Sequence, residues 1–316
     1  MMQLSARGSF DFASAEYLDL LATAGATAFQ HPCWLQPFYR RLPPANRVEP
    51  LIVLGHDRET GRLDLVLPLV RHADGSVEYA FLGFTDYACV VARPGAIAAD
   101  PGLAARLRET IGPHPLSVGP VRAEHAPQWR ELLGVAPVRL SFHAHALPIA
   151  GGAGSHFSSR RLGALRRKRR QLASPLELKS LKGPAVREAF LQAQSWRRGL
   201  FSDDPLQTGH GLDFYVDVAN GGARHGFADT FSLSAGGRTI AVLFGLRDGR
   251  SFRYLVLACD YKACGPSSPG LQVFDAAIAH WTSLGGEEFD FTIGDEPYKG
   301  ELGCVAAPMY GFKLAG

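Results

Sequence analysis

The sequence predicts an α+β protein of two units, each a mixed, mostly antiparallel sheet flanked by helices. The chain has 316 residues, enough for two domains with cores of ordinary size. Runs of β-forming residues separated by turn residues occur in both halves, and each run of strands continues into helix and strand. A glycine-rich segment, GGAGSH at 151–156, separates the halves. We therefore expect one domain over 1–150 and a second over 151–316.

The composition is that of a globular protein. Hydrophobic residues make up 46% of the chain and charged residues 20%, and the net charge of +3 is too small to indicate nucleic-acid binding by itself. No stretch approaches the roughly 20 apolar residues of a membrane helix, and the N-terminus shows no secretion-signal pattern. The five cysteines are scattered, without a C-x-x-C pair. We therefore expect a cytoplasmic protein with reduced thiols and no bound metal.

The first half contains a meander of strands between helical segments. Residues 14–30 predict a helix and a turn, and the aromatic and proline-rich segment 28–42 predicts a packed loop with a short helix. The turn sequences DRETGR and ADG separate three β-rich runs, which indicates antiparallel pairing. The expected strands lie at 50–56, 63–72, 76–84, 115–122 and 138–149, with helices at 102–112 and 128–133.

The second half begins with a basic helix over 157–173, in which Leu162, Leu165 and Leu172 share one face at helical spacing. The turns AGGR and DGR then separate three more β-rich runs, which again predicts a meander. The expected strands lie at 176–181, 228–234, 239–248, 252–260 and 288–294, with helices at 183–196, 212–220 and 269–284.

The most informative motif is a strand, a glycine-rich turn and a helix, in the sequence DYKACGPSSPG. Ser268 suits a helix N-cap and Pro269 the first helical position. The start of such a helix presents N–H groups and a positive dipole, for which a pyrophosphate is a suitable ligand. The alternative is a structural turn before a well-capped helix, which composition alone favours. The candidate ligand-binding residues are Cys264, Gly265, Ser267, Ser268 and Gly270.

A second motif, DEPYK at 295–299, follows the last predicted strand directly. Asp295 or Glu296 could act as a base, and Tyr298, with an ordinary pKa of about 10, could donate a proton. The alternative is an acidic turn with a lysine at the surface.

The basic helix has seven cationic residues, Arg160, Arg161, Arg166, Arg167, Lys168, Arg169 and Arg170. Such a cluster could contact a phosphate, an anionic lipid surface or an acidic polymer, or it could form a solvated face paired with acids. His143 and His145 share one side of a predicted strand, but no third ligand can be placed beside them, so a structural role is favoured. No G-x-S-x-G or G-x-x-x-x-G-K-[ST] pattern is present.

Taken together, four features resemble the CelD-like (BioF2-like) acetyltransferases associated with bacterial cellulose biosynthesis, a branch of the GNAT superfamily related to the Fem-type aminoacyl transferases. They are the helix GALRRKRRQLA, the tryptophan of QSWRRGL, the loop DYKACGPSSPG and the segment DFTIGDEPYKGELG. The segments AFQHPCWL and FLGFTDYACV are weaker matches. The loop CGPSSPG contains no arginine, unlike the usual GNAT pattern R/Q-x-x-G-x-G/A.

The resemblance implies tandem GNAT-like domains and transfer of an acyl group from acyl-CoA, such as acetyl-CoA, to an amine. The acceptor would be a sugar or an exopolysaccharide or cell-envelope precursor, and no cofactor would be tightly bound. The amine would attack the thioester directly, with Asp295 or Glu296 as base and Tyr298 protonating the departing thiolate. The residues expected to contact the acceptor are Asp86, Tyr87, Trp196 and Lys299.

Two alternatives stay open at this stage. One is a Fem-type transferase that uses aminoacyl-tRNA, with the helix over Arg160–Arg170 contacting the RNA backbone. The other is a non-catalytic binding module of the same fold that acts in exopolysaccharide synthesis.

Overall fold

A computed structural model describes residues 1–149, 159–172 and 175–316, without the side chains of residues 159–162. These residues form two compact units. Unit 1 contains Met1–His143 and Ala307–Gly316, and unit 2 contains Ala144–Ala306. The GGAGSH segment expected to link two domains lies outside the described residues, as do the side chains of Arg160, Arg161 and Leu162. A domain boundary at residue 150 stays a prediction.

Unit 1 is built on a sheet with the strand order β1-β2-β3-β4-β6-β13, in which β5 also pairs with β3. The pairs from β1 to β4 are antiparallel, β4 and β6 are parallel, and β13 returns antiparallel to β6. The strands are β1 (Met2–Arg7), β2 (Glu49–Asp57), β3 (Leu63–Arg71), β4 (Val77–Tyr79), β5 (Val91–Ala92), β6 (Leu116–Arg122) and β13 (Val305–Leu314). Strand β7 (Val138–Pro148) begins in unit 1 and continues into unit 2. The helices are α1 (Ala15–Leu21), α2 (Pro32–Asn46), α3 (Leu103–Ile111) and α4 (Ala126–Leu133), with a short 3-10 turn at Ala28–Gln30.

Helix α2 is longer than the short helix that the sequence predicts. It runs through Pro37, Pro43 and Pro44, each of which removes a backbone donor. Its apolar side chains compensate, because Trp34, Leu35, Phe38 and Leu42 are fully buried at helical spacing. Burial of one face therefore decides the structure of this segment more than local propensity does.

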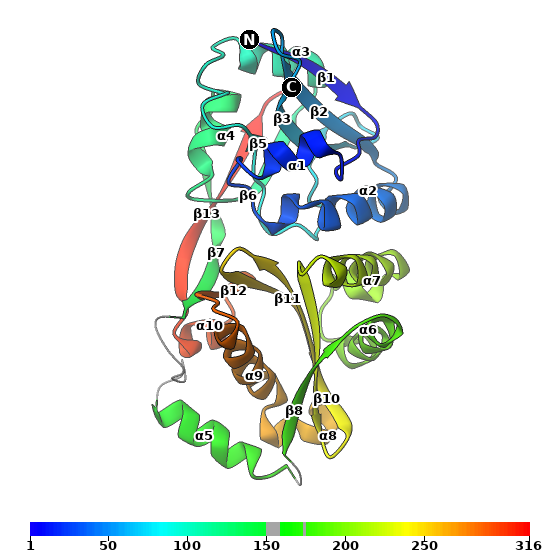
Figure 1. Cartoon of the computed structure of the whole chain (residues 1–316), viewed down its shortest axis with the longest axis vertical. Helices are drawn as coiled ribbons and strands as arrows, with labels where there is room; N and C mark the ends of the chain where they lie inside the picture. Colours follow the sequence, from blue (N-terminus) through cyan, green and yellow to red (C-terminus); the bar gives the residue numbers. More distant parts are fainter. Residues whose placement is uncertain (150–158, 173–174) are drawn as a thin grey trace. The chain divides into compact units, whose positions relative to one another are not determined.

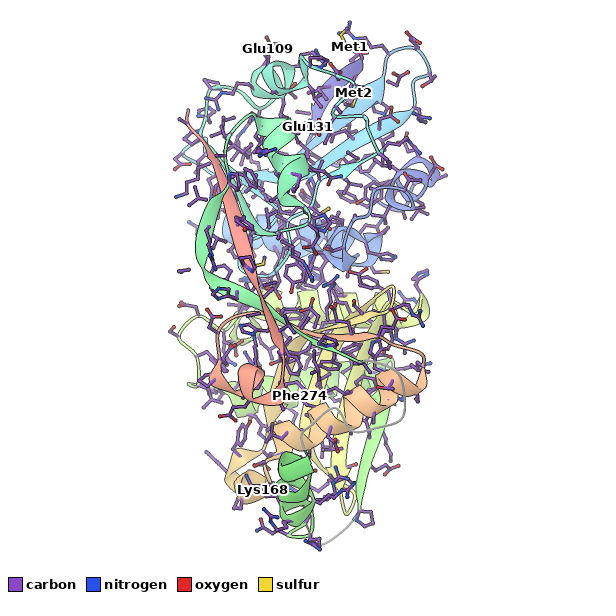
Figure 2. All side chains as sticks on the ribbon, turned by 90° about the vertical axis from the view of Figure 1, so that its left-hand side faces the viewer. Met1, Met2, Glu109, Glu131, Lys168 and Phe274 are labelled. Atoms are coloured by element: carbon purple, nitrogen blue, oxygen red, sulfur yellow. The ribbon has the colours of Figure 1, made fainter. Side chains whose placement is uncertain are left out.

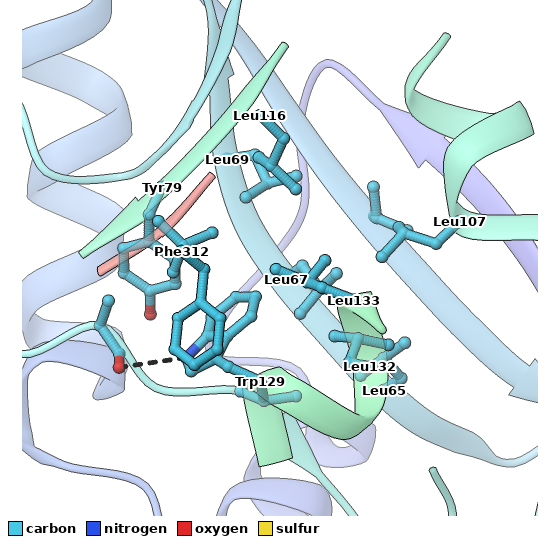
Figure 3. Close-up of a cluster of buried hydrophobic side chains, with 14 of the residues drawn as sticks. Leu65, Leu67, Leu69, Tyr79, Leu107, Leu116, Trp129, Leu132, Leu133 and Phe312 are labelled. Carbon is cyan, nitrogen blue, oxygen red and sulfur yellow. Dashed lines mark hydrogen bonds between the residues drawn. The ribbon is translucent and has the colours of Figure 1, made fainter. Parts of the chain in front are cut away.

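The core of unit 1 lies between the sheet and the helices α3 and α4 (Figure 3). Leu65, Leu67 and Leu69 from β3 meet Trp129 from α4 and Phe312 from β13. The Trp129 indole N–H donates to the carbonyl of Ala88 at 3.3 Å, so its polar edge is satisfied.

Unit 2 has the strand order β7-β12-β11-β10-β9-β8. Figure 1 shows helices α6 and α7 on one side of this sheet and α9 on the other. The further strands are β8 (Leu176–Leu181), β9 (Ala228–Ala235), β10 (Arg238–Asp248), β11 (Ser251–Cys259) and β12 (Glu288–Ile293). The helices are α5 (Ser159–Arg169), α6 (Pro184–Arg197), α7 (Gly209–Arg224), α8 (Tyr261–Cys264), α9 (Pro269–Ser283) and α10 (Pro297–Leu302), with 3-10 turns at Pro205–Gln207 and Gly265–Ser267.

The α+β fold expected from the sequence is confirmed, including the antiparallel meander of β9, β10 and β11. Among the described residues, no helix is both long enough and apolar enough to cross a bilayer. Among the described strands and α-helices, the sequence did not reveal β1, β5, α8, α10 and β13.

Candidate active site

In the sheet of unit 2, the adjacent parallel strands β11 and β12 are paired over only part of their length. Their register covers Ser251 to Arg253 on β11 and Glu288 to Asp290 on β12. Beyond these positions β11 continues to Cys259 and pairs with β10 on its other edge. In the described chain this part of β11 has no paired residues on β12. Two adjacent parallel strands that diverge in this way leave backbone groups available to a ligand between them. We call this feature the split.

The Arg253 side chain forms ion pairs at the end of the split where β11 and β12 are still paired. It is almost fully buried, as is Asp290, and its guanidinium contacts the carboxylates of Asp248 and Asp290. Asp290 also accepts the backbone N–H of Thr292 at 2.7 Å. Each buried charge thus has partners, which such burial requires.

Aromatic rings gather where the strands separate. Phe274 of α9 lies 5.1 Å from Tyr254 and 4.9 Å from Phe291, between ring centroids, and Tyr298 stacks on it at 6.0 Å. Tyr254 of β11 and Tyr298 also both pack on Phe291, with ring centroids 5.9 and 6.2 Å from its own. Burial raises the pKa of Tyr298 well above its usual value and raises the pKa of Tyr254 to about 12. The ordinary pKa that sequence reasoning gave Tyr298 is therefore corrected, because the ring is packed in an apolar cluster.

Lys299 fixes the loop that follows β12, and it is not at the surface. Its side chain is 2% exposed. The ammonium group donates to the carbonyls of Ile293 at 2.8 Å and Gly294 at 3.0 Å, and it pairs with Glu296 at 2.9 Å. These partners explain how a lysine can be buried here. Contact of Lys299 with a substrate stays a prediction, which this arrangement does not support.

Asp295 pairs with a histidine that sequence reasoning assigned to a structural role. Nε2 of His145 lies 2.9 Å from Oδ1 of Asp295. His145 belongs to β7, which pairs antiparallel with β12. Its side chain is 11% exposed, whereas that of Asp295 is 45% exposed. The carboxylate is thus the accessible member of the pair, and the imidazole is the buried one.

The predicted donor loop consists of two short helical turns, α8 and the 3-10 turn Gly265–Ser267, instead of an open glycine-rich turn. Ser268 occupies the N-cap position of α9 in the left-handed region, with φ of 53°, and its side chain makes no capping hydrogen bond. Its hydroxyl instead accepts from Nζ of Lys168 at 2.7 Å. Ser267 is buried, and its hydroxyl donates to the carbonyl of Cys264.

The basic helix α5 packs against the N-terminal half of α9 (Figure 2 labels Lys168 on α5 and Phe274 on α9). Arg169 donates to Gln272 at 2.9 Å and to Asp275 at 2.7 Å, and Leu165 is buried in the core of unit 2. The outer side chains Arg166, Arg167 and Arg170 are exposed. Of the five cationic side chains over 166–170, Lys168 and Arg169 therefore contact α9 or its N-cap residue, and the other three are exposed.

The two glycines of the donor loop differ in their surroundings. A Cβ atom at Gly265 would meet nothing within 4 Å. A Cβ atom at Gly270, in the first turn of α9, would lie 3.0 Å from the Tyr261 hydroxyl and within 4 Å of Leu257 and Cys259 on β11. A substitution at Gly265 should therefore disturb the fold less than one at Gly270.

The remaining predicted site residues are spread over both units. Trp196 is half-buried near the end of α6, and the next residue, Arg197, donates to the carbonyl of Leu257 on β11 at 2.8 Å. Asp86 and Tyr87 belong to unit 1. Tyr87 is fully buried, with its ring 5.5 Å from that of Phe29, so a role in an acceptor groove stays a prediction that its burial does not support.

Within the described ranges, no group of three or more His, Cys, Asp or Glu residues is arranged to hold a metal ion. The candidate site in unit 2 consists of the split, the loop after β12 and the N-terminus of α9.

Residues 158–300 match the family model described as an acetyltransferase (GNAT) domain. No curated protein sequence matches the chain significantly. FemX is similar in structure, with a TM-score of 0.63 at 9% identity, covering 98% of this chain and 97% of that one. L-PGS from Bacillus licheniformis has a TM-score of 0.60 at 9% identity and covers 95% and 91%. A tandem GNAT protein from the clavulanic acid biosynthesis pathway has a TM-score of 0.53 at 13% identity and covers 99% and 98%.

These similarities agree with the geometry of unit 2, because the matched residues include the split, α9 and the loop after β12. The structural neighbours extend the likeness of fold over nearly the whole chain, and one of them is a tandem GNAT protein. The chain accordingly has a GNAT-like fold, and its acetyltransferase (GNAT) domain makes it an acyltransferase.

Proposed function

We propose that the enzyme transfers an acyl group from acyl-CoA to an amine of a sugar or of an exopolysaccharide or cell-envelope precursor. The amine nitrogen attacks the thioester carbonyl directly, the C–S bond breaks, and the sulfur leaves as a thiolate. Such a reaction needs the two reactants held in line, a base for the amine proton and stabilisation of the leaving group. The finer resemblance to CelD-like acetyltransferases is part of this proposal.

The main support is the N-terminus of α9, where Lys168 donates to Ser268 at 2.7 Å. A cation at this end of a helix is unfavourable by itself, since the helix dipole is positive there. A bound pyrophosphate would reverse the sign of that interaction, because it would meet both the ammonium group and the N–H groups of the helix. Lys168 would thus supply the positive charge that the arginine-free loop CGPSSPG lacks.

The loop after β12 supplies the expected acid and base. Asp295 is the better base, because Glu296 is paired with the ammonium group of Lys299. Tyr298 packs with Tyr254 around Phe274 and Phe291 at the split, and its raised pKa keeps the phenol protonated. The tyrosine would therefore stabilise the departing thiolate by donating a hydrogen bond, without complete transfer of its proton.

A thermal-shift titration tests the donor. Acetyl-CoA or a longer acyl-CoA at 100 times its dissociation constant should add about 2.7 kcal/mol to the free energy of unfolding. Gly265→Asp, which places a negative charge beside the phosphates, should abolish this shift, whereas the matched neutral variant Gly265→Asn should retain it. A shift of equal size in Gly265→Asp would place the phosphates elsewhere, and no shift with any acyl-CoA would refute the proposed donor.

An aminoacyl-tRNA donor is the second candidate, and the exposed arginines of α5 favour it. Arg166, Arg167 and Arg170 form a cationic surface beyond the contacts with α9. Binding of tRNA through this surface should weaken steeply with salt. The triple substitution of these arginines with glutamine should flatten the salt dependence, measured by filter binding. Absence of tRNA binding at low salt would exclude this candidate.

A further inference from the structure

The pairing of β7 with β12 contains a distortion directly beside Asp295. Asp290 pairs with Ala146 and Ile293 with Ala144, so two residues of β12 lie opposite the single residue His145. This is the pattern of a β-bulge. Thr292, within the bulge, has φ of 55°, which a β-branched residue rarely adopts. The strand therefore holds an unfavourable local conformation at the position that faces the histidine.

We infer that His145 is a positioning residue, which holds Asp295 in the orientation that accepts the amine proton. The inference rests on the proposed acyl transfer and deepens it. The bulge changes the path of β12 opposite His145, just before the loop that carries Asp295. The hydrogen bond of 2.9 Å then fixes one carboxylate oxygen. The Asp295 side chain is 45% exposed, so a substrate can approach the carboxylate from solvent.

The proposed step needs no reactant other than the acyl-CoA and the amine. As the nitrogen forms the amide bond, the electron pair of the C–S bond leaves with sulfur, and the proton of the nitrogen passes to the carboxylate of Asp295. His145 stays hydrogen-bonded to Asp295 throughout and does not contact the substrate. A carboxylate whose rotation is restricted reaches the transition state with less reorganisation, which is how a positioning residue affects turnover.

Steady-state kinetics of the full-length enzyme with acetyl-CoA and an amine acceptor test the inference. His145→Ala should lower kcat by about 10- to 100-fold, because the general base would lose part of its contribution. The KM for acetyl-CoA should stay within about twofold of the parental value. His145→Gln, whose amide N–H can replace Nε2–H, should restore kcat to within about threefold of the parent. His143→Ala, on the same strand two residues earlier, is the matched control and should retain parental kcat.

A double-mutant cycle distinguishes a loss of positioning from a general loss of the fold in His145→Ala. In an Asp295→Asn background, exchanging His145 for glutamine or alanine should have no further effect on kcat, because the base is already gone. Parental kcat in His145→Ala, or independent effects in the cycle, would overturn the inference. Equal losses in His145→Gln and His145→Ala would also overturn it, since the imidazole itself would then be required. Absence of acyl transfer by the parent enzyme would instead refute the proposed function.

Discussion

Replacing Lys299 with methionine should destabilise unit 2 far more than a surface substitution does. Methionine retains the apolar stem but removes the donor shared by the carbonyls of Ile293 and Gly294 and the carboxylate of Glu296. An acceptor left buried without a partner costs roughly 1–3 kcal/mol. In Lys299→Met two carbonyls would each incur this cost, and the removal of a buried charge would offset part of it. The expected loss in the free energy of unfolding is therefore about 3 kcal/mol.

Thermal unfolding measures this loss directly. For a domain of this size about 3 kcal/mol corresponds to a decrease in Tm of roughly 6–12 °C. Lys182→Met, at an exposed position, is the control and should change the free energy of unfolding by less than about 0.5 kcal/mol. A parental Tm for Lys299→Met, together with a raised KM for the amine, would show that Lys299 binds substrate and that the proposed role in fixing the loop is wrong.

Other substitutions test the split, a buried thiol and the core of unit 1. Tyr298→Phe should lower kcat by about 100-fold with little change in acyl-CoA affinity, measured by single-turnover kinetics, and full activity would remove the phenol from the mechanism. Burial raises the pKa of Cys259 to about 12, so its contribution to stability is complete below pH 9 and is lost as the pH rises towards 12. In urea unfolding, ionisation of this thiol should therefore lower the stability of the parent by up to about 1.4 kcal/mol per pH unit above pH 9. Cys259→Val has no thiol and should not show this part of the decrease. Phe312→Ala should cost about 3–5 kcal/mol in the same assay, because the ring is fully buried; a cost below 1 kcal/mol would contradict its place in the core.

Local patterns were sufficient to predict most elements of unit 2. The turns AGGR and DGR separate the three antiparallel strands of the meander, and α9 begins at Pro269 as expected from its helix-start signals. These signals act within a few residues, where backbone geometry and side-chain burial agree. The roles of Ser268 and Lys168 were not predictable in the same way, because the side chain expected to cap α9 binds a lysine 100 positions away.

Contacts between distant segments account for what sequence reasoning missed. His145 and Asp295 are 150 positions apart, and the bulge opposite His145 leaves no periodic signal in the sequence. Lys299 lies in an acidic, proline-containing segment typical of a surface turn, and only the fold buries it. Helix α2 shows the same limit, since its internal prolines argue locally against a helix that tertiary burial stabilises.

The return of β13 to unit 1 also has a consequence for the order of folding on the ribosome. Met309 and Phe312 complete the unit 1 core, and β13 pairs with β6, yet they are synthesised after the whole of unit 2. Unit 2 is continuous in sequence and can fold as soon as it emerges. At the usual rates of synthesis, unit 1 would wait roughly 10–30 s with the edge of β6 uncovered, a period in which chaperones or a neighbouring nascent chain could pair with it.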